Sequence, residues 1–154
     1  MSKYIQDNLG KDENVIYEAS ISWATLTLPG IIAVVLAPFT LGLSFIIVIP
    51  RVIRNLTTEL AFTNKRLIGK TGLISTKSMD SPLNKVQNVI ISSGLLGKIF
   101  NFGDVAVTTA AGNYIYSGVS NPSDFRAKLM NQIEQYDDDR IKKQAEELAN
   151  AIKK

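Results

Sequence analysis

Hydrophobic and polar residues alternate along much of the chain, but one long stretch lacks this alternation. No charged residue occurs between Glu18 and Arg51, and the stretch from Ser22 to Pro50 is mostly apolar. An uncharged apolar run longer than about 18 residues is a candidate membrane helix. A cleaved signal peptide is not expected, because the preceding segment is long and acidic and no small-residue cleavage site follows. The pattern therefore predicts a membrane-embedded region at residues 23–55.

Two helical arrangements fit this apolar block. A single helix of about 28 residues would be about 42 Å long and would exceed a hydrocarbon core of about 30 Å unless it tilts. It would also contain Pro38, which removes a backbone hydrogen bond and bends a helix. The alternative is a helical hairpin that turns at residues 37–40, with arms at 22–37 and 39–54 that are each about 24 Å long.

The segment before the block favours the hairpin. Residues 14–23 alternate between apolar and polar side chains, which is the spacing of a strand. One face of this strand carries Val15, Tyr17, Ala19, Ile21 and Trp23. A strand needs a sheet, and the other strand-rich part of the chain follows the block. If the N-terminal segment 1–22 adds a strand to that sheet, both ends of the block lie on one side of the membrane.

After the block, short runs of alternating and β-branched residues are separated by turn residues. Six strands are expected there, at 57–63, 66–71, 73–79, 84–92, 104–110 and 114–120. The segment 94–103 is expected to form a helical turn or tight loop that buries Leu95, Leu96 and Phe100. The fold class is therefore mainly β with a membrane α-hairpin. With the strand before the block, residues 56–136 are expected to form an antiparallel sandwich or partly closed barrel of about seven strands, closed by a C-terminal helix.

The closing helix has a recognisable start. Asn121 is expected to cap it, Pro122 fits its first position, and Asp124 complements the helix dipole. Its apolar stripe, expected to pack onto the sheet, consists of Phe125, Leu129, Ile133 and Tyr136.

The residues after this stripe form a separate charged tail, 137–154. The stripe loses its phase at Asp137–Arg140, where we expect a solvated break in the helix. A second stripe follows, at Ile141, Ala145, Leu148 and Ile152. An exposed helix, a coiled-coil seam and a membrane-surface helix all fit this spacing. We identify Ile141, Leu148 and Ile152 as candidate partner-binding residues.

Charge is concentrated directly after the apolar block. Residues 51–98 hold eight Lys and Arg residues against two acidic residues, a net charge of +6. By the positive-inside tendency, this side of the membrane, with the N-terminus and the β domain, is predicted to be cytoplasmic. Trp23 is expected at the membrane interface. The candidate contacts to anionic lipid headgroups are Arg51, Arg54, Lys65, Arg66 and Lys70. Lys77 and Lys85 are assigned to a solvated surface.

Composition argues against catalysis and metal binding. The chain has no cysteine and no histidine, so it lacks a thiolate nucleophile, the commonest general base and the commonest metal ligand. No catalytic residue, metal site or cofactor is expected. The run Asp137–Asp139 lacks the alternating ligands and the glycine turn of a hard-cation loop. Nucleic-acid binding is not expected either, because the basic residues are few and the apolar block ties the domain to a bilayer.

The tripeptide Gly69-Lys70-Thr71 is one glycine short of a phosphate-binding loop, since Asn64 occupies the first glycine position. A phosphate-binding loop leads into a helix, whereas here a turn at Gly72 leads into a β-branched segment. We therefore expect a strand and a turn rather than a nucleotide site. Residues 94–98, Gly-Leu-Leu-Gly-Lys, fail similarly because Ile99 stands at the Ser/Thr position.

The order of these segments resembles the bacterial pleckstrin-homology-like (PH domain) membrane proteins. The resemblance rests on the stretches LGKDENVIYEASISW, ELAFTNKRLIGKTG with its continuation to FGDVAVTTAAG, and VSNPSDFRAKL. It implies a PH-like sandwich carried on a membrane hairpin, with no enzymatic activity. The tail from Asp137 onward departs from the family pattern. Fold likeness by itself does not transfer the lipid binding of eukaryotic relatives.

Two functions fit the sequence. The first is a membrane-anchored, non-enzymatic binding module that presents its sandwich at the cytoplasmic face to a protein partner or to copies of itself. The second is an anionic-lipid-sensing or envelope-stress and resistance component that binds headgroups through its juxtamembrane basic residues. An enzyme is not supported by any constellation of residues.

Overall fold

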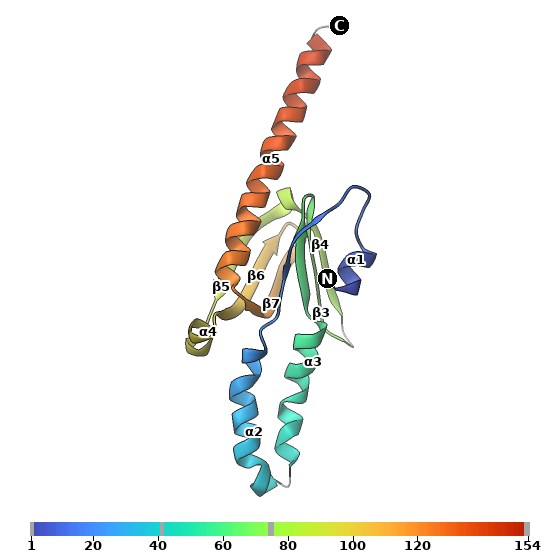
Figure 1. The fold of residues 1–154 in the computed structure, drawn as a ribbon. Coiled ribbons are helices and arrows are strands. Elements are labelled where there is room, and N and C mark those ends of the chain that lie inside the picture. Colours follow the sequence, from blue (N-terminus) through green and yellow to red (C-terminus); the bar gives the residue numbers. More distant parts are fainter. Residues whose placement is uncertain (1, 41, 74–75, 153–154) are drawn as a thin grey trace.

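The computed structural model describes residues 2–40, 42–73 and 76–152, and Figure 1 shows its arrangement. Its strands, in chain order, are β1 (Val15–Ala19), β2 (Glu59–Thr63), β3 (Arg66–Thr71), β4 (Lys77–Pro82), β5 (Val86–Ser92), β6 (Phe102–Thr109) and β7 (Gly112–Ser120). Its α-helices are α1 (Lys3–Asp7), α2 (Thr27–Thr40), α3 (Ile49–Thr57), α4 (Leu95–Ile99) and α5 (Pro122–Ile152). Three short 3-10 helices are η1 (Trp23–Leu26), η2 (Leu43–Ile47) and η3 (Leu83–Lys85).

The strands form two antiparallel sheets, ordered β1-β2-β3-β4 and β5-β6-β7. Where the sheets approach each other, Ile21 forms a bridge with Val119, the Ser22 amide donates to the Gly118 carbonyl at 2.7 Å, and the Ser120 amide donates to the Ser20 carbonyl at 2.8 Å. This connection is confined to the ends of the strands. The fold is therefore a two-sheet sandwich rather than a closed barrel, and the strand before the apolar block belongs to it.

The core lies between the sheets and under the first half of α5. Val105 and Val107 of β6 and Leu60 and Phe62 of β2 are fully buried, because alternate residues of a strand face the same side. Phe125 of α5 is also fully buried. Its ring lies 5.7 Å from that of Phe62 in an edge-on arrangement, which adds specific aromatic contact to area burial. The predicted stripe of α5 thus packs onto the sheets.

The apolar block forms a helical hairpin. From η1 the chain runs down α2 to Thr40 and returns through η2 and α3 to the start of β2 (Figure 1). Pro38 lies inside α2, and Gly42 has a φ of 85°, a conformation that favours glycine. Pro38 removes only the bond that its amide would donate to the Val34 carbonyl, four residues earlier, so α2 continues to Thr40 and the reversal comes later than the predicted 37–40.

Two other boundaries differ from the prediction. The third strand of the β domain was expected at 73–79 but runs from Lys77 to Pro82, and residues 74–75 lie outside the described part of the chain. Ser81 and Pro82 end this strand rather than interrupt it, because an edge strand tolerates proline. The predicted break at Asp137–Asp139 is wrong. α5 is one helix of 31 residues, and Asp137 forms an ion pair with Arg140 one turn later at 3.3 Å.

Candidate functional site

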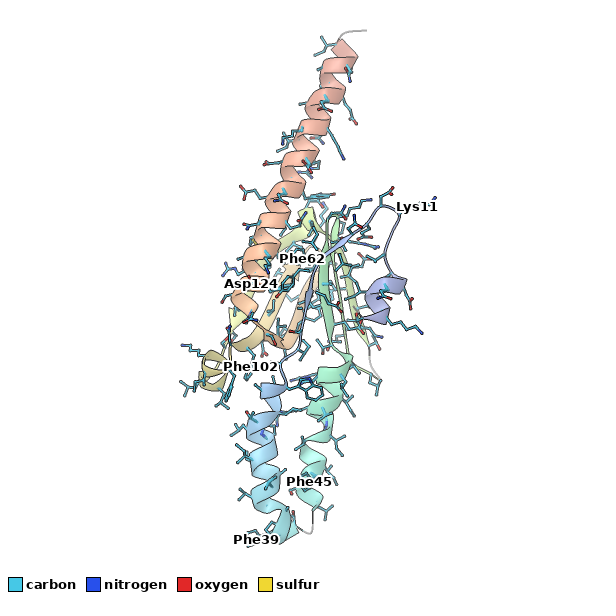
Figure 2. The ribbon with its side chains drawn as sticks, viewed as in Figure 1. Lys11, Phe39, Phe45, Phe62, Phe102 and Asp124 are labelled. Carbon is cyan, nitrogen blue, oxygen red and sulfur yellow. The ribbon has the colours of Figure 1, made fainter. Side chains whose placement is uncertain are left out.

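The hairpin exposes most of its large apolar side chains. More than half of the exposed large hydrophobic residues in the described part of the chain lie between Trp23 and Leu56. The most exposed on α2 is Phe39, at 84%, and Leu43 and Phe45 on the returning arm are 65% and 50% exposed. Figure 2 places Phe39 and Phe45 toward the end of the hairpin farthest from the sheets. Ordinary monomeric proteins rarely expose a continuous apolar surface of this extent, so something else must cover it.

Among the described residues, one helical segment is long and apolar enough to cross a membrane, Trp23–Thr40, with 18 residues and a mean hydropathy of 1.7. Only 11% of its residues are buried inside the protein, so it is not a core helix of this domain. The two arms touch through small residues. Ala33 and Ser44 are buried between them, and the Ser44 hydroxyl donates to the Ala33 carbonyl at 2.8 Å.

The base of the hairpin is polar. The Asn55 amide nitrogen donates to the Thr25 hydroxyl at 2.6 Å and to the Ser22 carbonyl at 3.4 Å, which ties the two arms together. A small cavity beside this contact is lined by Arg51 and Arg54. These arginines, predicted headgroup contacts, therefore lie together where the hairpin meets the sheets. Trp23, the predicted interface residue, begins the first arm and is 58% exposed.

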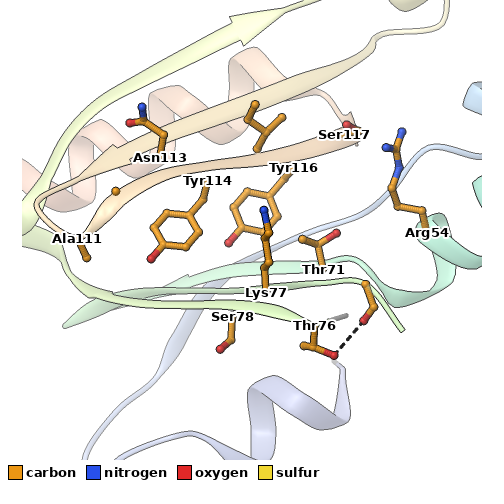
Figure 3. Close-up of a pocket in the computed structure, with 13 residues that line it drawn as sticks. Arg54, Thr71, Thr76, Lys77, Ser78, Ala111, Asn113, Tyr114, Tyr116 and Ser117 are labelled. Atoms are coloured by element: carbon orange, nitrogen blue, oxygen red, sulfur yellow. Dashed lines mark hydrogen bonds between the residues drawn. The ribbon is translucent and has the colours of Figure 1, made fainter. Parts of the chain in front are cut away.

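A larger cavity, of about 860 Å³, runs along β7 between the two sheets, with Arg54 at the end next to the hairpin and Ala111 at the other end (Figure 3). It is bounded by the end of α3, the end of β3, the start of β4 and the first half of β7. Its polar side chains include Arg54, Lys77, Ser78, Asn113, Tyr114 and Tyr116. Figure 3 shows Lys77 beside the rings of Tyr114 and Tyr116, and Arg54 at the end next to the hairpin.

The electrostatic character of this cavity is positive. Among its described lining residues are Arg54 and Lys77, several hydroxyl groups and an amide, but no carboxylate. Burial raises the pKa of the Tyr116 phenol well above its usual value, so this hydroxyl stays protonated and able to donate a hydrogen bond. Cations and hydroxyl donors without a competing carboxylate suit a small anionic group.

Gly69 makes room for this arrangement. A Cβ at Gly69 would lie 2.2 Å from the Tyr116 hydroxyl oxygen, so the ring of Tyr116 crosses directly over the β3 backbone. The tripeptide Gly69-Lys70-Thr71 is thus the end of a strand, as expected, and leads into a turn where Gly72 has a φ of 94°. Close packing between sheets, rather than phosphate cradling, explains the glycine.

The other predicted headgroup residues are placed less favourably. The Lys65 ammonium donates to the Lys11 carbonyl at 3.0 Å, and the Lys70 ammonium lies 4.8 Å from the centre of the Tyr4 ring. Arg66 is held by carboxylates. Its guanidinium donates twice to Glu13 at 2.8 Å and once to Asp80. Lys65 and Arg66 lie at the turn between β2 and β3, and the Lys70 side chain is directed to Tyr4, so the five predicted headgroup residues do not form one cluster.

The pair Arg66–Glu13 ties the N-terminal segment to the β2–β3 hairpin. The side chain of Glu13 is only 2% exposed, and its oxygens also accept from the Thr63 hydroxyl and the Gly10 amide, both at 2.7 Å. Hydrogen bonds from Arg66 are the largest cause that lowers the pKa of Glu13 to about 2. The same pairing raises the pKa of Arg66. Glu13 and Asp80 balance the charge of Arg66, so we assign this network a structural role rather than ligand binding.

The segment 94–103 differs from the prediction. Leu95 and Phe100 were expected to be buried in a compact turn, but they are 84% and 49% exposed, and Ile99 is 73% exposed. The helix α4 is fixed instead by Gly97, where a Cβ would lie 2.4 Å from the Phe102 carbonyl oxygen. It sits at the end of the sheets from which the hairpin leaves (Figure 1). The only signal in the sequence was the run of apolar residues, which does not reveal which side they face.

The second half of α5 projects beyond the sheets (Figure 1). Ile141, Leu148 and Ile152, the predicted partner-binding residues, are 58%, 65% and 85% exposed. They form a helical stripe with no cover from the described part of the chain.

Sequence reasoning missed the cavity between the sheets. Lys77 had been assigned to a solvated surface, Tyr114 and Tyr116 were read only as strand residues, and Asn113 fell in the turn before their strand. No local pattern marks them, because they converge from β4 and β7, which are far apart in the chain. The polar character of β7, with two tyrosines and an asparagine, was the one available hint.

Comparison with known proteins agrees with the fold. The sequence model of the family described as "Bacterial PH domain" matches residues 19–154. Among solved structures, the fold is similar to a DUF1696 family protein with a pleckstrin-homology domain from Shewanella loihica PV-4. The identity is 9%, 85% of this chain and 91% of that chain are covered, and the TM-score is 0.45. No curated protein matches the sequence. The family match confirms the resemblance drawn from the sequence.

Proposed function

Because the chain belongs to the bacterial PH domain family, we propose that it is a membrane-anchored, non-catalytic binding module. The observation that carries the proposal is the exposed apolar surface of the hairpin, from Trp23 to Leu56, next to a folded domain with its own core. Burial of such a surface in hydrocarbon is favourable by about 25 cal/mol per Å². The hairpin anchors the chain, and the sandwich projects from the membrane surface.

A bilayer fits this surface better than a soluble partner does. No charged residue occurs between Glu18 and Arg51, whereas a protein interface usually has a polar rim. Serine and threonine hydroxyls along the hairpin bond to backbone carbonyls, as Thr27 does to Ala24 at 2.8 Å. That arrangement satisfies polar atoms where water is absent. The exposed Leu95, Ile99 and Phe100 of α4 lie toward the same end and extend the membrane-facing surface.

The orientation follows from the charges at the base. Arg51 and Arg54 directly follow the apolar arm, and basic residues flanking membrane segments are retained on the cytoplasmic side. We therefore place the N-terminus and the sandwich in the cytoplasm, with the hairpin in the cell membrane.

A charge in the middle of α2 tests the anchor. Val34 is 63% exposed, and Val34→Lys adds a cost of about 2.5–3.5 kcal/mol for a cation within the bilayer. We expect the variant to shift from the membrane fraction to the soluble or aggregated fraction after alkaline washing. The matched control is Ala149→Lys, on the exposed tail and outside its apolar stripe. Equal membrane retention of the wild type and the Val34→Lys chain would contradict the anchor.

The partner contact is proposed to be the tail of α5. Its exposed stripe of Ile141, Leu148 and Ile152 lies on a helix that reaches away from the hairpin, so it is accessible from the cytoplasm. The proposed association is with a protein partner or with a second copy. In detergent, the double variant Ile141→Asp, Leu148→Asp should have a smaller particle mass by light scattering than wild type if copies associate through it. An unchanged mass, together with unchanged chemical crosslinking in cells, would exclude the stripe as the contact.

A second candidate function, recognition of an anionic headgroup, is favoured by the cavity between the sheets. Arg54 and Lys77 approach it from separate elements, with no carboxylate among the described lining residues. It opens beside the base of the hairpin, where phosphate groups of a cytoplasmic leaflet would lie. Each basic residue near an anionic leaflet contributes about 1 kcal/mol of attraction.

This candidate is tested with the full chain in detergent, titrated with short-chain phosphatidylglycerol or phosphatidylcholine. Calorimetry should detect the anionic lipid only, more weakly as salt rises. The double variant Arg54→Gln, Lys77→Gln should lose about 2 kcal/mol of binding. The control Lys142→Gln, Lys143→Gln carries the same charge change on the tail and should bind normally. Equal binding of both lipids by wild type would reject the headgroup site.

A further inference from the structure

The apolar part of the hairpin is short compared with a bilayer. The Asn55–Thr25 contact and the neighbouring Arg51 and Arg54 mark the polar base of the hairpin. Beyond that base, the 14 residues of α2 extend about 21 Å. The returning arm, residues 43–50, is mostly 3-10 helix and extends about 15 Å. The hydrocarbon core of a bilayer is about 30 Å thick.

The tip of the hairpin is apolar. In a hairpin that crossed the bilayer, the tip would lie among the headgroups of the far leaflet and would be expected to carry polar or charged residues. Here the described residues at the tip include Phe39, Leu43 and Phe45, all at least half exposed. If these side chains lay among headgroups and water, the favourable free energy of removing their apolar surface from water would be lost.

Polar atoms near the tip are bonded within the hairpin. The Thr40 hydroxyl donates to the Leu36 carbonyl at 2.9 Å and accepts from the Ser44 amide at 3.3 Å. The Gly42 amide donates to the Ala37 carbonyl at 3.1 Å. Non-helical backbone at membrane depth is tolerated only where its polar groups find such partners. These bonds allow the turn to lie in hydrocarbon.

From the short arms, the apolar tip and its internal hydrogen bonds, we infer that the hairpin enters one leaflet only and ends inside the hydrocarbon layer. The partner of this surface is the leaflet on the side of the sandwich. The inference rests on the proposed membrane anchor and adds its depth. Trp23 and the arginines at the base lie in the headgroup region, and Phe39 lies near the bilayer centre.

Single cysteines test this depth, because the natural chain has none. Phe39→Cys reports on the tip and Ala149→Cys, beside the apolar stripe, on the exposed tail. Val34→Cys, in the middle of α2, lies in hydrocarbon for either depth. Each variant is expressed in a bacterial host and treated with a membrane-impermeant maleimide, in spheroplasts and in inverted membrane vesicles. The tail cysteine should react in inverted vesicles. The tip cysteine should remain unlabelled in both preparations and react only after detergent is added.

The alternatives give different results. If the tip cysteine reacts in spheroplasts while Val34→Cys does not, the hairpin crosses the bilayer, and the single-leaflet inference is wrong while the anchor stands. If the tip and mid-helix cysteines both react in inverted vesicles as readily as the tail cysteine, the hairpin lies in water. That result would overturn the proposed anchor as well.

A tryptophan variant checks the depth without a cysteine. Trp23 is the sole tryptophan, so Trp23→Phe, Phe39→Trp moves the fluorophore from the base to the tip. In liposomes with brominated lipids, the wild-type fluorescence should be quenched most by bromines near the headgroups. The variant should be quenched most by bromines near the ends of the acyl chains. Maximal quenching of the variant by shallow bromines would contradict insertion into one leaflet.

Discussion

The sandwich and the hairpin use the same apolar residue types but bury them differently. In the sandwich, Phe62 and Phe125 are fully buried and touch each other. In the hairpin, Phe39 is 84% exposed and Phe45 is 50% exposed. The difference shows that apolar composition alone does not make a core. A sheet can cover its inner face with a second sheet and a helix, whereas two short helices can cover only the narrow strip between them.

The helix α5 repeats this contrast within one element. Leu129, in its first half, is fully buried under the sheets, while Leu148, in its second half, is 65% exposed. Both belong to apolar stripes at helical spacing. The same pattern therefore leads to a buried stripe that packs on the sheets in the first half of α5 and to an exposed stripe in the second half.

The sharpest test of the contrast pairs two phenylalanines. Phe125→Ala removes a fully buried ring that packs against Phe62 and Tyr17, and should lower the free energy of unfolding by about 3–5 kcal/mol. Phe39→Ala, at the tip of the hairpin, should change it by less than about 0.5 kcal/mol. Denaturant unfolding in one detergent, followed by circular dichroism, measures both. Equal losses would mean that the hairpin tip shares the core of the sandwich.

Acid should weaken the sandwich through Glu13. Its pKa falls from 4.5 to about 2 on folding, so the folded state favours the carboxylate. The resulting stabilisation is complete above the unfolded-state value and disappears as pH falls from 4.5 to about 2. The loss is on the order of 3 kcal/mol. Urea midpoints across this pH range measure it.

The matched variant Glu13→Gln should be less stable at neutral pH and should lack this acid-dependent part. If it kept the full acid dependence, the titrating group would lie elsewhere.

Crowding at Gly69 gives a smaller effect. Gly69→Ala would bring a Cβ against the ring of Tyr116 and should destabilise the sandwich by about 1–3 kcal/mol. Tyr116→Leu removes the outer ring atoms that clash, so adding it should make the alanine less harmful than in the wild-type background. Gly94→Ala is the control, because nothing lies within 4 Å of its Cβ. Thermal unfolding of the wild type, the two single variants Gly69→Ala and Tyr116→Leu, and their double variant measures the coupling. Strictly additive effects would contradict the contact.

The smallest effect is expected on the tail. Leu148→Ala should alter the free energy of unfolding by less than about 0.5 kcal/mol, because the side chain is 65% exposed. Leu129→Ala, the equivalent change in the buried half of α5, should cost about 2–5 kcal/mol. Denaturant midpoints of the two variants measure the difference. A large loss for Leu148→Ala would show that the tail is already covered by a second copy.

Much of the fold was predictable because its signals are local. Alternation predicted the strands around Phe62 and Val105, and helical spacing predicted the packing of Phe125. The turn position was misplaced because Pro38 was read as an interruption, although it lies within the last turns of α2. The break at Asp137–Asp139 was wrong because a change of apolar phase does not interrupt backbone hydrogen bonds in a helix.

The site was less predictable, because it depends on which elements meet. Arg51 and Arg54 were found from their position after the apolar block, but Lys77 and Tyr116 join the cavity only through the approach of two sheets. Arg66 looked like its basic neighbours in sequence, and only the fold brings Glu13 to it, 53 residues away.

The sequence by itself determined the apolar block, the strand-rich domain and the absence of cysteine and histidine, because composition and periodicity are properties of neighbouring residues. Tertiary structure decided which apolar residues are buried and which basic residues are paired with carboxylates. Both outcomes depend on contacts between distant segments. Leu95 is exposed and Glu13 is buried because of where the chain folds back, and no local pattern encodes that position.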